Sequence, residues 1–179
     1  MRLFHFSDDP AIARFEPRPV LTPSLRPPGR GWLNGPLVWA IEGERQAMYL
    51  FPRDCPRILL WPTETTTADD RARFWGHEAW RMIAYVEDAW LDAIARATLY
   101  RYDMPPQTFE SLDDAGMWIS RAPVTPIGMG TIDNLQEALA EQRVALRALP
   151  TLAPLADVWA TTLHASGVRL RNARNWPRP

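Results

Sequence analysis

The chain begins MRLFHFSDDP (residues 1–10), and this stretch starts the fold. From Leu3 to Ser7 the side chains alternate between two sides, with two phenylalanines on one side and His5 in the middle of the other. A period of two residues is typical of a β-strand, and both sides of this one are partly apolar. We therefore expect a short strand that carries a histidine and ends before Pro10.

A long proline-rich segment follows this strand. Residues 10–36 hold seven prolines and three glycines, which exclude a long helix or a central strand there. The segment is predicted to be a loop. Long loops in compact domains serve as lids or ligand-binding segments, and a structural wrap over the sheet fits the composition equally well.

Short strands and short helices are expected along the middle of the chain, each bounded by turn residues. The expected strands are residues 37–41, 57–61, 78–86, 99–103, 117–120 and 124–127. The expected helices are residues 44–51, 67–75 and 88–95, the second of them capped by Thr67.

The pattern changes near the end of the chain. Asp133 and Gln136 resemble a capping box, and leucines then recur at helical spacing. Thr151 can cap a second helix after an intervening proline. The prediction is a C-terminal helical hairpin over residues 131–166, followed by an Arg-rich tail over residues 167–179.

Many short strands with a helical end predict an α+β fold. The 179 residues, 46% of them apolar, suffice for a single domain with a sizeable core, residues 1–179. The net charge of -1 argues against a surface that binds nucleic acid throughout, but allows a local basic patch. No apolar stretch approaches the ~20 residues that cross a bilayer, and the N-terminus lacks signal-peptide features. We expect no membrane association and a cytoplasmic location.

Several common chemistries lack their sequence patterns. No glycine-rich phosphate loop and no G-x-S-x-G elbow occur. His5, His77 and His164 lie far apart and without metal-ligand spacing, so no metal site is expected. The single Cys55 fits a small core residue better than a nucleophile.

The C-terminal segment, residues 169–176, combines three arginines with two asparagines and a tryptophan. Such a segment can grip phosphates and stack a base, as in single-stranded nucleic-acid binding. A solvated tail explains the same composition.

One family resemblance rests on short motifs. The strand Leu3 to Ser7, with a histidine followed two residues later by a small hydroxyl residue, resembles the first catalytic strand of the ADP-ribosyltransferase-like fold. An aromatic residue on a strand before an alanine-bearing helix, Trp39 and Ala47, resembles the second motif. Residues 100–110 and 117–124 resemble the later strands, including an "aromatic, x, Ser, Arg, x, Pro" stretch.

This likeness covers residues 2–128 and is greatest to the small rifamycin-modifying ADP-ribosyltransferases. It implies an ADP-ribosyltransferase-like α+β core with a split sheet. The chain as a whole also resembles an uncharacterised bacterial domain family of unknown function, whose name carries no activity.

The resemblance also implies site residues and NAD as co-substrate. By it, His5 hydrogen-bonds a ribose hydroxyl, with Ser7 beside it, and Trp39 stacks on the nicotinamide in place of the usual tyrosine. The catalytic acid is Glu110, Asp113 or Asp114, and we take Glu110 as the candidate. A carboxylate near a developing oxocarbenium ion and an aromatic face beside a flat cation both suit this chemistry. Phe6 stands where the family has glycine. The alternative is therefore that the pocket is inactive or has taken on another function.

The sequence alone is therefore compatible with three functions. The first is an NAD- or nucleotide-binding ADP-ribosyltransferase-like domain that transfers ADP-ribose. The second is a non-catalytic module that binds nucleic acid, through the Arg-rich tail, or a protein. The third is transfer of a 2'-phosphate from RNA onto NAD, for which Arg18, Arg30 or Arg121 can clamp the phosphate.

Overall fold

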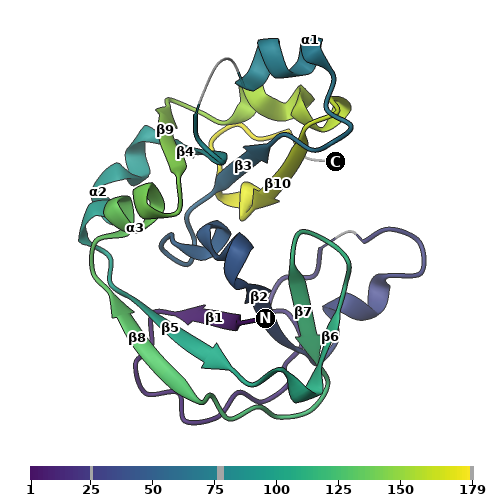
Figure 1. Cartoon of the computed structure of the whole chain (residues 1–179), viewed down its shortest axis with the longest axis vertical. Coiled ribbons are helices and arrows are strands. Elements are labelled where there is room, and N and C mark those ends of the chain that lie inside the picture. The colour runs from purple at the N-terminus through teal and green to yellow at the C-terminus, as the bar shows by residue number, and fades with distance from the viewer. Residues whose placement is uncertain (25, 76–78, 178–179) are drawn as a thin grey trace. The chain divides into compact units, whose positions relative to one another are not determined.

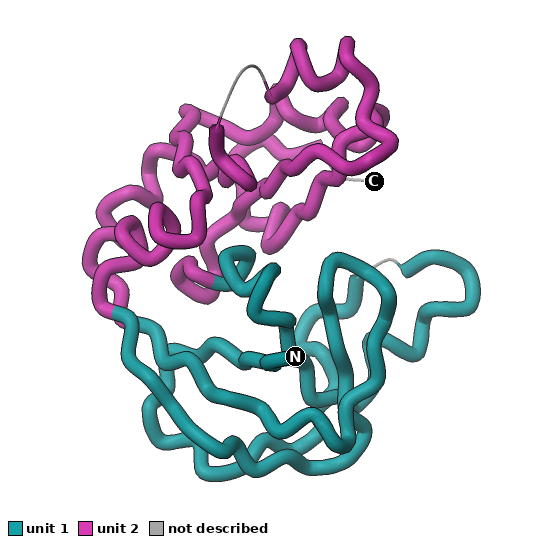
Figure 2. Tube along the Cα trace, in the orientation of Figure 1, with its two compact units in different colours: residues 1–49, 99–132 teal, residues 50–98, 133–179 magenta. Residues whose placement is uncertain are grey.

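The computed structural model describes residues 1–24, 26–75 and 79–177, and the chain divides into two compact units (Figure 2). Unit 1 comprises residues 1–49 and 99–132, and unit 2 comprises residues 50–98 and 133–179. Each unit is built around its own sheet (Figure 1). Helices and strands are both present, and the expected α+β class is confirmed.

Unit 1 is an antiparallel six-stranded sheet in the order β6-β7-β2-β1-β5-β8. Its strands are β1 (Leu3–Ser7), β2 (Val38–Glu42), β5 (Leu99–Met104), β6 (Phe109–Ser111), β7 (Met117–Ser120) and β8 (Gly128–Ile132). Its 3₁₀ helices are η1 (Gly31–Asn34), η2 (Gly43–Tyr49) and η5 (Pro106–Thr108). The opening strand predicted from the sequence is thus confirmed, and it lies inside the sheet between β2 and β5.

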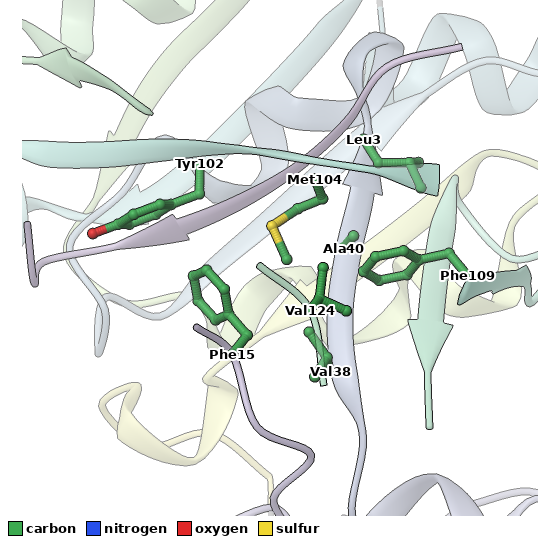
Figure 3. Packing of buried hydrophobic residues seen from close by; sticks show 8 residues of the cluster. All are labelled: Leu3, Phe15, Val38, Ala40, Tyr102, Met104, Phe109 and Val124. Atoms are coloured by element: carbon green, nitrogen blue, oxygen red, sulfur yellow. The ribbon is translucent and has the colours of Figure 1, made fainter. Parts of the chain in front are cut away.

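The register of β1 sorts the side chains of unit 1 onto two faces. Leu3 pairs with Glu42 of β2 and with Met104 of β5, and His5 pairs with Tyr102. Paired residues project to the same face, and residues two apart on a strand share it. One buried cluster covers that face (Figure 3), formed by Leu3, Phe15, Val38, Ala40, Tyr102, Met104, Phe109 and Val124.

The opposite face has a smaller cluster of Leu33, Leu37 and Ile119, against which Trp39 packs. The 3₁₀ helix η1 supplies Leu33, and η2 contacts both β1 and β2. The proline-rich segment reaches both faces, because Phe15 bridges to Val124 of the first cluster and Arg18 bridges to Leu37 of the second. This loop therefore wraps the sheet.

Unit 2 contains a four-stranded sheet in the order β10-β3-β4-β9. Its strands are β3 (Arg57–Trp61), β4 (Met82–Glu87), β9 (Val144–Leu149) and β10 (His164–Val168). Only the β4–β9 pair among these is parallel. Its helices are α1 (Ala68–Asp70), η3 (Arg71–Trp75), η4 (Asp88–Trp90), α2 (Leu91–Arg96), α3 (Leu135–Glu141), η6 (Ala153–Ala160) and η7 (Leu170–Asn172).

The predicted C-terminal helical hairpin is wrong in its first half. Asn134, not Asp133, is the cap of α3, and its side chain accepts a hydrogen bond from the backbone of Glu137. The helix is short because Arg143 adopts a left-handed conformation with φ 55° and donates to the carbonyl of Ala140. The leucines that continue the helical spacing belong instead to β9, which pairs with β4.

The second half of the hairpin is confirmed only in part, because the helix η6 ends at Ala160. After η6 the chain turns at Thr161, whose backbone N–H donates to Val158, and Thr162 is held by the carboxylate of Asp70. Residues 164–168 then form β10, which pairs antiparallel with β3. The sheet of unit 2 thus takes two stretches that local spacing assigns to helices.

Other boundaries differ less. Residues 124–127 do not form a strand, since Val124 makes only an isolated bridge and the strand is β8, which begins at Gly128. The short strand β6 was not expected from the sequence. The start of the strand predicted over residues 78–86 lies outside the described residues, and β4 begins at Met82.

Candidate functional site

His5 lies on β1 with its imidazole against the first cluster. Its Nδ1 is 2.8 Å from the backbone oxygen of Trp39, and its ring centroid is 4.6 Å from that of Phe15. A carbonyl can only accept, so Nδ1 carries the hydrogen in this bond. The backbone pairing of β1 with β2 ends at Phe4 and Ile41, so the side chain of His5 joins the two strands beyond that point.

Ser7 is buried at the end of β1, and its hydroxyl accepts a hydrogen bond from the backbone N–H of Asp9 at 3.1 Å. Tyr102 extends the arrangement, because its hydroxyl donates to the carbonyl of Asp9 and accepts from the N–H of Ile12. These contacts fix the turn out of the strand. The hydroxyl of Ser7 is therefore engaged in local structure.

Trp39 projects to the face opposite His5. Phe4 and Ile41 are paired, and Trp39 lies two residues from Ile41, so it shares their side of the sheet. Its ring is partly exposed, and the guanidinium carbon of Arg26 lies 5.8 Å from the ring centroid. This distance is within the range of a cation–π contact.

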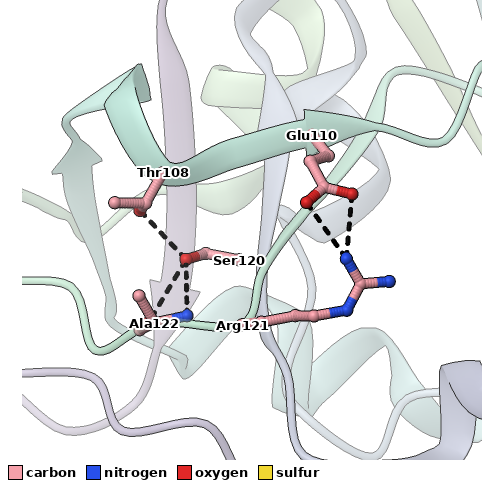
Figure 4. A network of polar contacts seen from close by, with 5 residues as sticks. All are labelled: Thr108, Glu110, Ser120, Arg121 and Ala122. Atoms are coloured by element: carbon pink, nitrogen blue, oxygen red, sulfur yellow. Dashed lines mark hydrogen bonds and ion pairs between the residues drawn. The ribbon is translucent and has the colours of Figure 1, made fainter.

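Glu110 lies on β6 and is held by Arg121 (Figure 4). One guanidinium nitrogen of Arg121 donates to both carboxylate oxygens, at 3.0 and 2.9 Å. The carboxylate side chain is 65% exposed, so it stays accessible to a ligand. The same guanidinium lies 4.9 Å from the ring of Trp32, which is itself exposed.

The stretch that resembles the later family motif has a structural role at this place. The hydroxyl of Ser120 is hydrogen-bonded to that of Thr108 at 2.9 Å and to both backbone groups of Ala122 (Figure 4). These bonds fix the turn after β7, and Arg121 leaves that turn toward Glu110. The short motif thus positions the partner of the candidate acid.

Asp113 and Asp114 lie in the turn between β6 and β7. Asp113 has a left-handed backbone with φ 52°, and its N–H donates to the hydroxyl of Ser111. The carbonyl of Asp114 accepts from the N–H of Met117. Both aspartates form the turn. Of the three acids, Glu110 is the one that lies on a strand, and its side chain is on the same face of the sheet as Trp39.

The sheet brings Trp39 and Glu110 together but separates both from His5. Trp39 pairs with Ile119 from one side, and Glu110 pairs with Ile119 from the other. The two side chains therefore share a face, about 10 Å apart across two strand spacings. His5 lies on the other face, and its imidazole is hydrogen-bonded to the backbone of Trp39.

Two residues of this surface were missed by the sequence reasoning, Arg26 and Trp32. Both lie in the proline-rich segment, where no periodicity marks them. Asn34 fixes their loop, since its side chain donates to the carbonyl of Ser24 at 2.9 Å and its oxygen accepts from Arg26 at 3.4 Å. We call Arg26, Trp32, Trp39, Glu110 and Arg121 the Trp39 surface.

The remaining candidates lie elsewhere. Arg18 and Arg30 are exposed on the wrapping loop. Cys55 is fully buried, and this burial raises the pKa of its thiol to about 12. His77 lies outside the described residues. Within residues 1–24, 26–75 and 79–177, no three side chains of histidine, cysteine, aspartate or glutamate gather as a metal site.

Comparison with known proteins identifies the family. A model described as a family of unknown function (DUF6886) matches residues 4–173. The chain belongs to this family. The match includes nearly all of both units, so the family extends beyond the residues 2–128 of the ADP-ribosyltransferase likeness.

The other comparisons add no relative. No curated protein matches the chain. No solved structure matches it either. A likeness to ADP-ribosyltransferases is therefore carried only by the short motifs. Among the described residues, no helix has both the length and the apolar character needed to span a bilayer.

Proposed function

We propose that unit 1 binds a nucleotide, NAD or a close relative, on the Trp39 surface. The observation that carries this proposal is that Trp39 and Glu110 flank Ile119 on one face of the sheet. The indole of Trp39 and the accessible carboxylate of Glu110 are about 10 Å apart, a distance that one nucleoside can span. Arginines stand beside both of them.

The chemistry of the surface suits a nucleotide with a flat cationic ring. The guanidinium of Arg26 over Trp39 is itself a flat cation, so a nicotinamide ring can take its place on the indole. Arg26 is then available for a phosphate, for which arginine supplies paired donors. In this proposal His5 is a positioning residue that holds the backbone of Trp39.

The family resemblance extends the proposal to ADP-ribosyl transfer. In that reaction the bond between the nicotinamide nitrogen and the ribose carbon breaks, and nicotinamide leaves. An acceptor nucleophile bonds to the same carbon and releases its proton. Glu110 would stabilise the positive charge that develops on the ribose, a role worth about 10²- to 10³-fold in rate for one such group.

Thermal unfolding of the full chain with millimolar NAD or ADP-ribose tests binding. Ligand at 100 times Kd stabilises by about 2.7 kcal/mol, so the Tm should rise. Trp39→Leu should abolish the rise, whereas Trp80→Leu, which removes an exposed tryptophan of unit 2, should leave it intact. No rise in Tm, or an equal loss in both variants, would refute the proposal.

Release of nicotinamide separates transfer from binding. We expect Glu110→Gln to keep the thermal shift and to lower nicotinamide release from NAD by about 10²-fold. Binding without any release by the wild-type chain would limit the function to nucleotide binding.

A further inference from the structure

The C-terminal segment of unit 2 is docked on that unit rather than loose. The N–H of Arg174 donates to the buried carboxylate of Glu87 at 2.7 Å, and its carbonyl accepts from Thr151 at 2.6 Å. Asn172 donates to the carbonyl of Asp54 at 2.8 Å. These bonds use backbone groups and an asparagine, so they fix the segment without using the guanidinium of Arg174.

Two tryptophans lie close together here, Trp176 on the docked segment and Trp159 on the earlier helix η6. Trp159 of η6 is 45% exposed, and its ring meets that of Trp176 edge to face at 5.8 Å. The indole of Trp159 also packs closely against Gly167, where an added Cβ would lie 2.9 Å from the ring. The indole of Trp159 is therefore held in place and still open to solvent.

The stretch of chain that carries the two tryptophans is net basic. Residues 157–177 contain Arg169, Arg171 and Arg174 against one acidic residue, Asp157. Arg171 and Arg174 are exposed. Arg169 donates to the carbonyl of Arg53 at 3.2 Å and lies 3.9 Å from the carboxylate of Asp54, which offsets part of its charge.

We propose that this surface of unit 2, made of Trp159, Arg171, Arg174 and Trp176, binds single-stranded nucleic acid. A fixed indole offers a base a stacking partner at little cost in conformational entropy. The arginines can contact the phosphates on either side of the stacked base. All of these residues belong to unit 2, so the proposal is independent of nucleotide binding by unit 1.

Fluorescence anisotropy of the full chain with a labelled oligo(dT) of about 12 nucleotides tests the proposal, since such sites take roughly 4 to 16 nucleotides. Phosphate contacts by Arg171 and Arg174 predict that log K falls with log salt concentration with a slope of about -1.4, because each contact on a single strand contributes about -0.7. Replacing Arg171 and Arg174 by glutamine should reduce the slope by about 1.4. Both arginines are exposed, so the variant should fold.

Matched controls separate this surface from general charge and aromatic effects. Arg96→Gln removes an exposed arginine of α2 and should leave the affinity unchanged. Trp176→Leu should weaken binding about tenfold, whereas Trp80→Leu should not. A duplex of the same length should bind more weakly than the single strand, because its bases are already stacked.

Four results would overturn the proposal. They are no binding at low salt, an equal loss of affinity in Arg96→Gln, equal affinity for the duplex, and displacement of the oligonucleotide by NAD. The last result would assign the oligonucleotide to the nucleotide surface of unit 1. A failure of NAD to bind leaves this proposal standing.

Discussion

The imidazole of His5 is hydrogen-bonded to the backbone of Trp39 at 2.8 Å, although the side chains of the two residues lie on opposite faces of one sheet. The histidine thus links strands β1 and β2 and packs on Phe15. We therefore expect His5 to act on the Trp39 surface by holding β2 in position rather than by contacting a ligand.

His5→Phe should keep the packing on Phe15 and lose the donor to Trp39. The unpaired carbonyl should lower the free energy of unfolding by about 1 to 3 kcal/mol, as measured by urea denaturation. His5→Ala should cost more, because it also leaves a cavity. If His5 acts only by holding β2 in position, the folded His5→Phe variant should keep part of its thermal shift with NAD. Complete loss of that shift in a folded variant would instead assign His5 a direct ribose contact.

The ion pair between Glu110 and Arg121 should contribute little to stability. Both side chains are more than half exposed, at 65% and 55%, and exposed pairs are worth about 0.2 to 1 kcal/mol. A double-mutant cycle with Glu110→Gln and Arg121→Gln should give a coupling energy in that range by chemical denaturation. A coupling well above it would mean that the pair is part of a buried network.

Cys55 should be unreactive in the folded protein. Burial raises the pKa of its thiol from 9.0 to about 12, so almost no thiolate forms near neutral pH. Iodoacetamide should modify the chain only after denaturant is added. Rapid labelling of the native protein would show that Cys55 becomes exposed through local opening.

The same thiol predicts how stability depends on alkaline pH. Between pH 9 and about 12 the unfolded thiol loses its proton while the folded one keeps it, so the folded state is progressively disfavoured. The contribution should approach ~1.4 kcal/mol per pH unit within that window and vanish below it. The Cys55→Ala variant should lack this slope, so the difference between the two stability curves should change steadily with pH across the window. Parallel curves would contradict the raised pKa.

Gly167→Ala should destabilise unit 2 and move Trp159. The new methyl group would lie 2.5 Å from Leu170 and 2.9 Å from the indole, and such crowding costs about 1 to 3 kcal/mol. We expect a lower Tm and a shifted tryptophan emission maximum. Gly130→Ala is the matched strand variant, since nothing lies within 4 Å of its Cβ, and it should show neither change.

The sequence by itself predicted the elements whose signals are local. The alternation in residues 3–7 predicted β1, the compact apolar run 57–61 predicted β3, and Thr67 was correctly expected to cap the helix that follows. Proline content predicted the long loop. These features depend on neighbours in the chain, so sequence spacing contains them.

Local spacing failed where a distant strand supplied the hydrogen bonds. The leucines of β9 and the residues of β10 suit a helix, but the edges of β4 and β3 pair with them instead. The sequence also gives no sign of the left-handed turn at Arg143, because that position is not a glycine. Pairing energy from residues far along the chain therefore outweighed helical propensity at these two places.

The candidate site shows the same division. The family resemblance pointed to His5, Trp39 and Glu110 as residues suited to a nucleotide, but it contained no information on strand register. Only the tertiary structure decided that Trp39 and Glu110 share a face through Ile119 and that His5 lies on the other. The physical reason is that side chains alternate along a strand, so a one-residue change in pairing moves a side chain across the sheet.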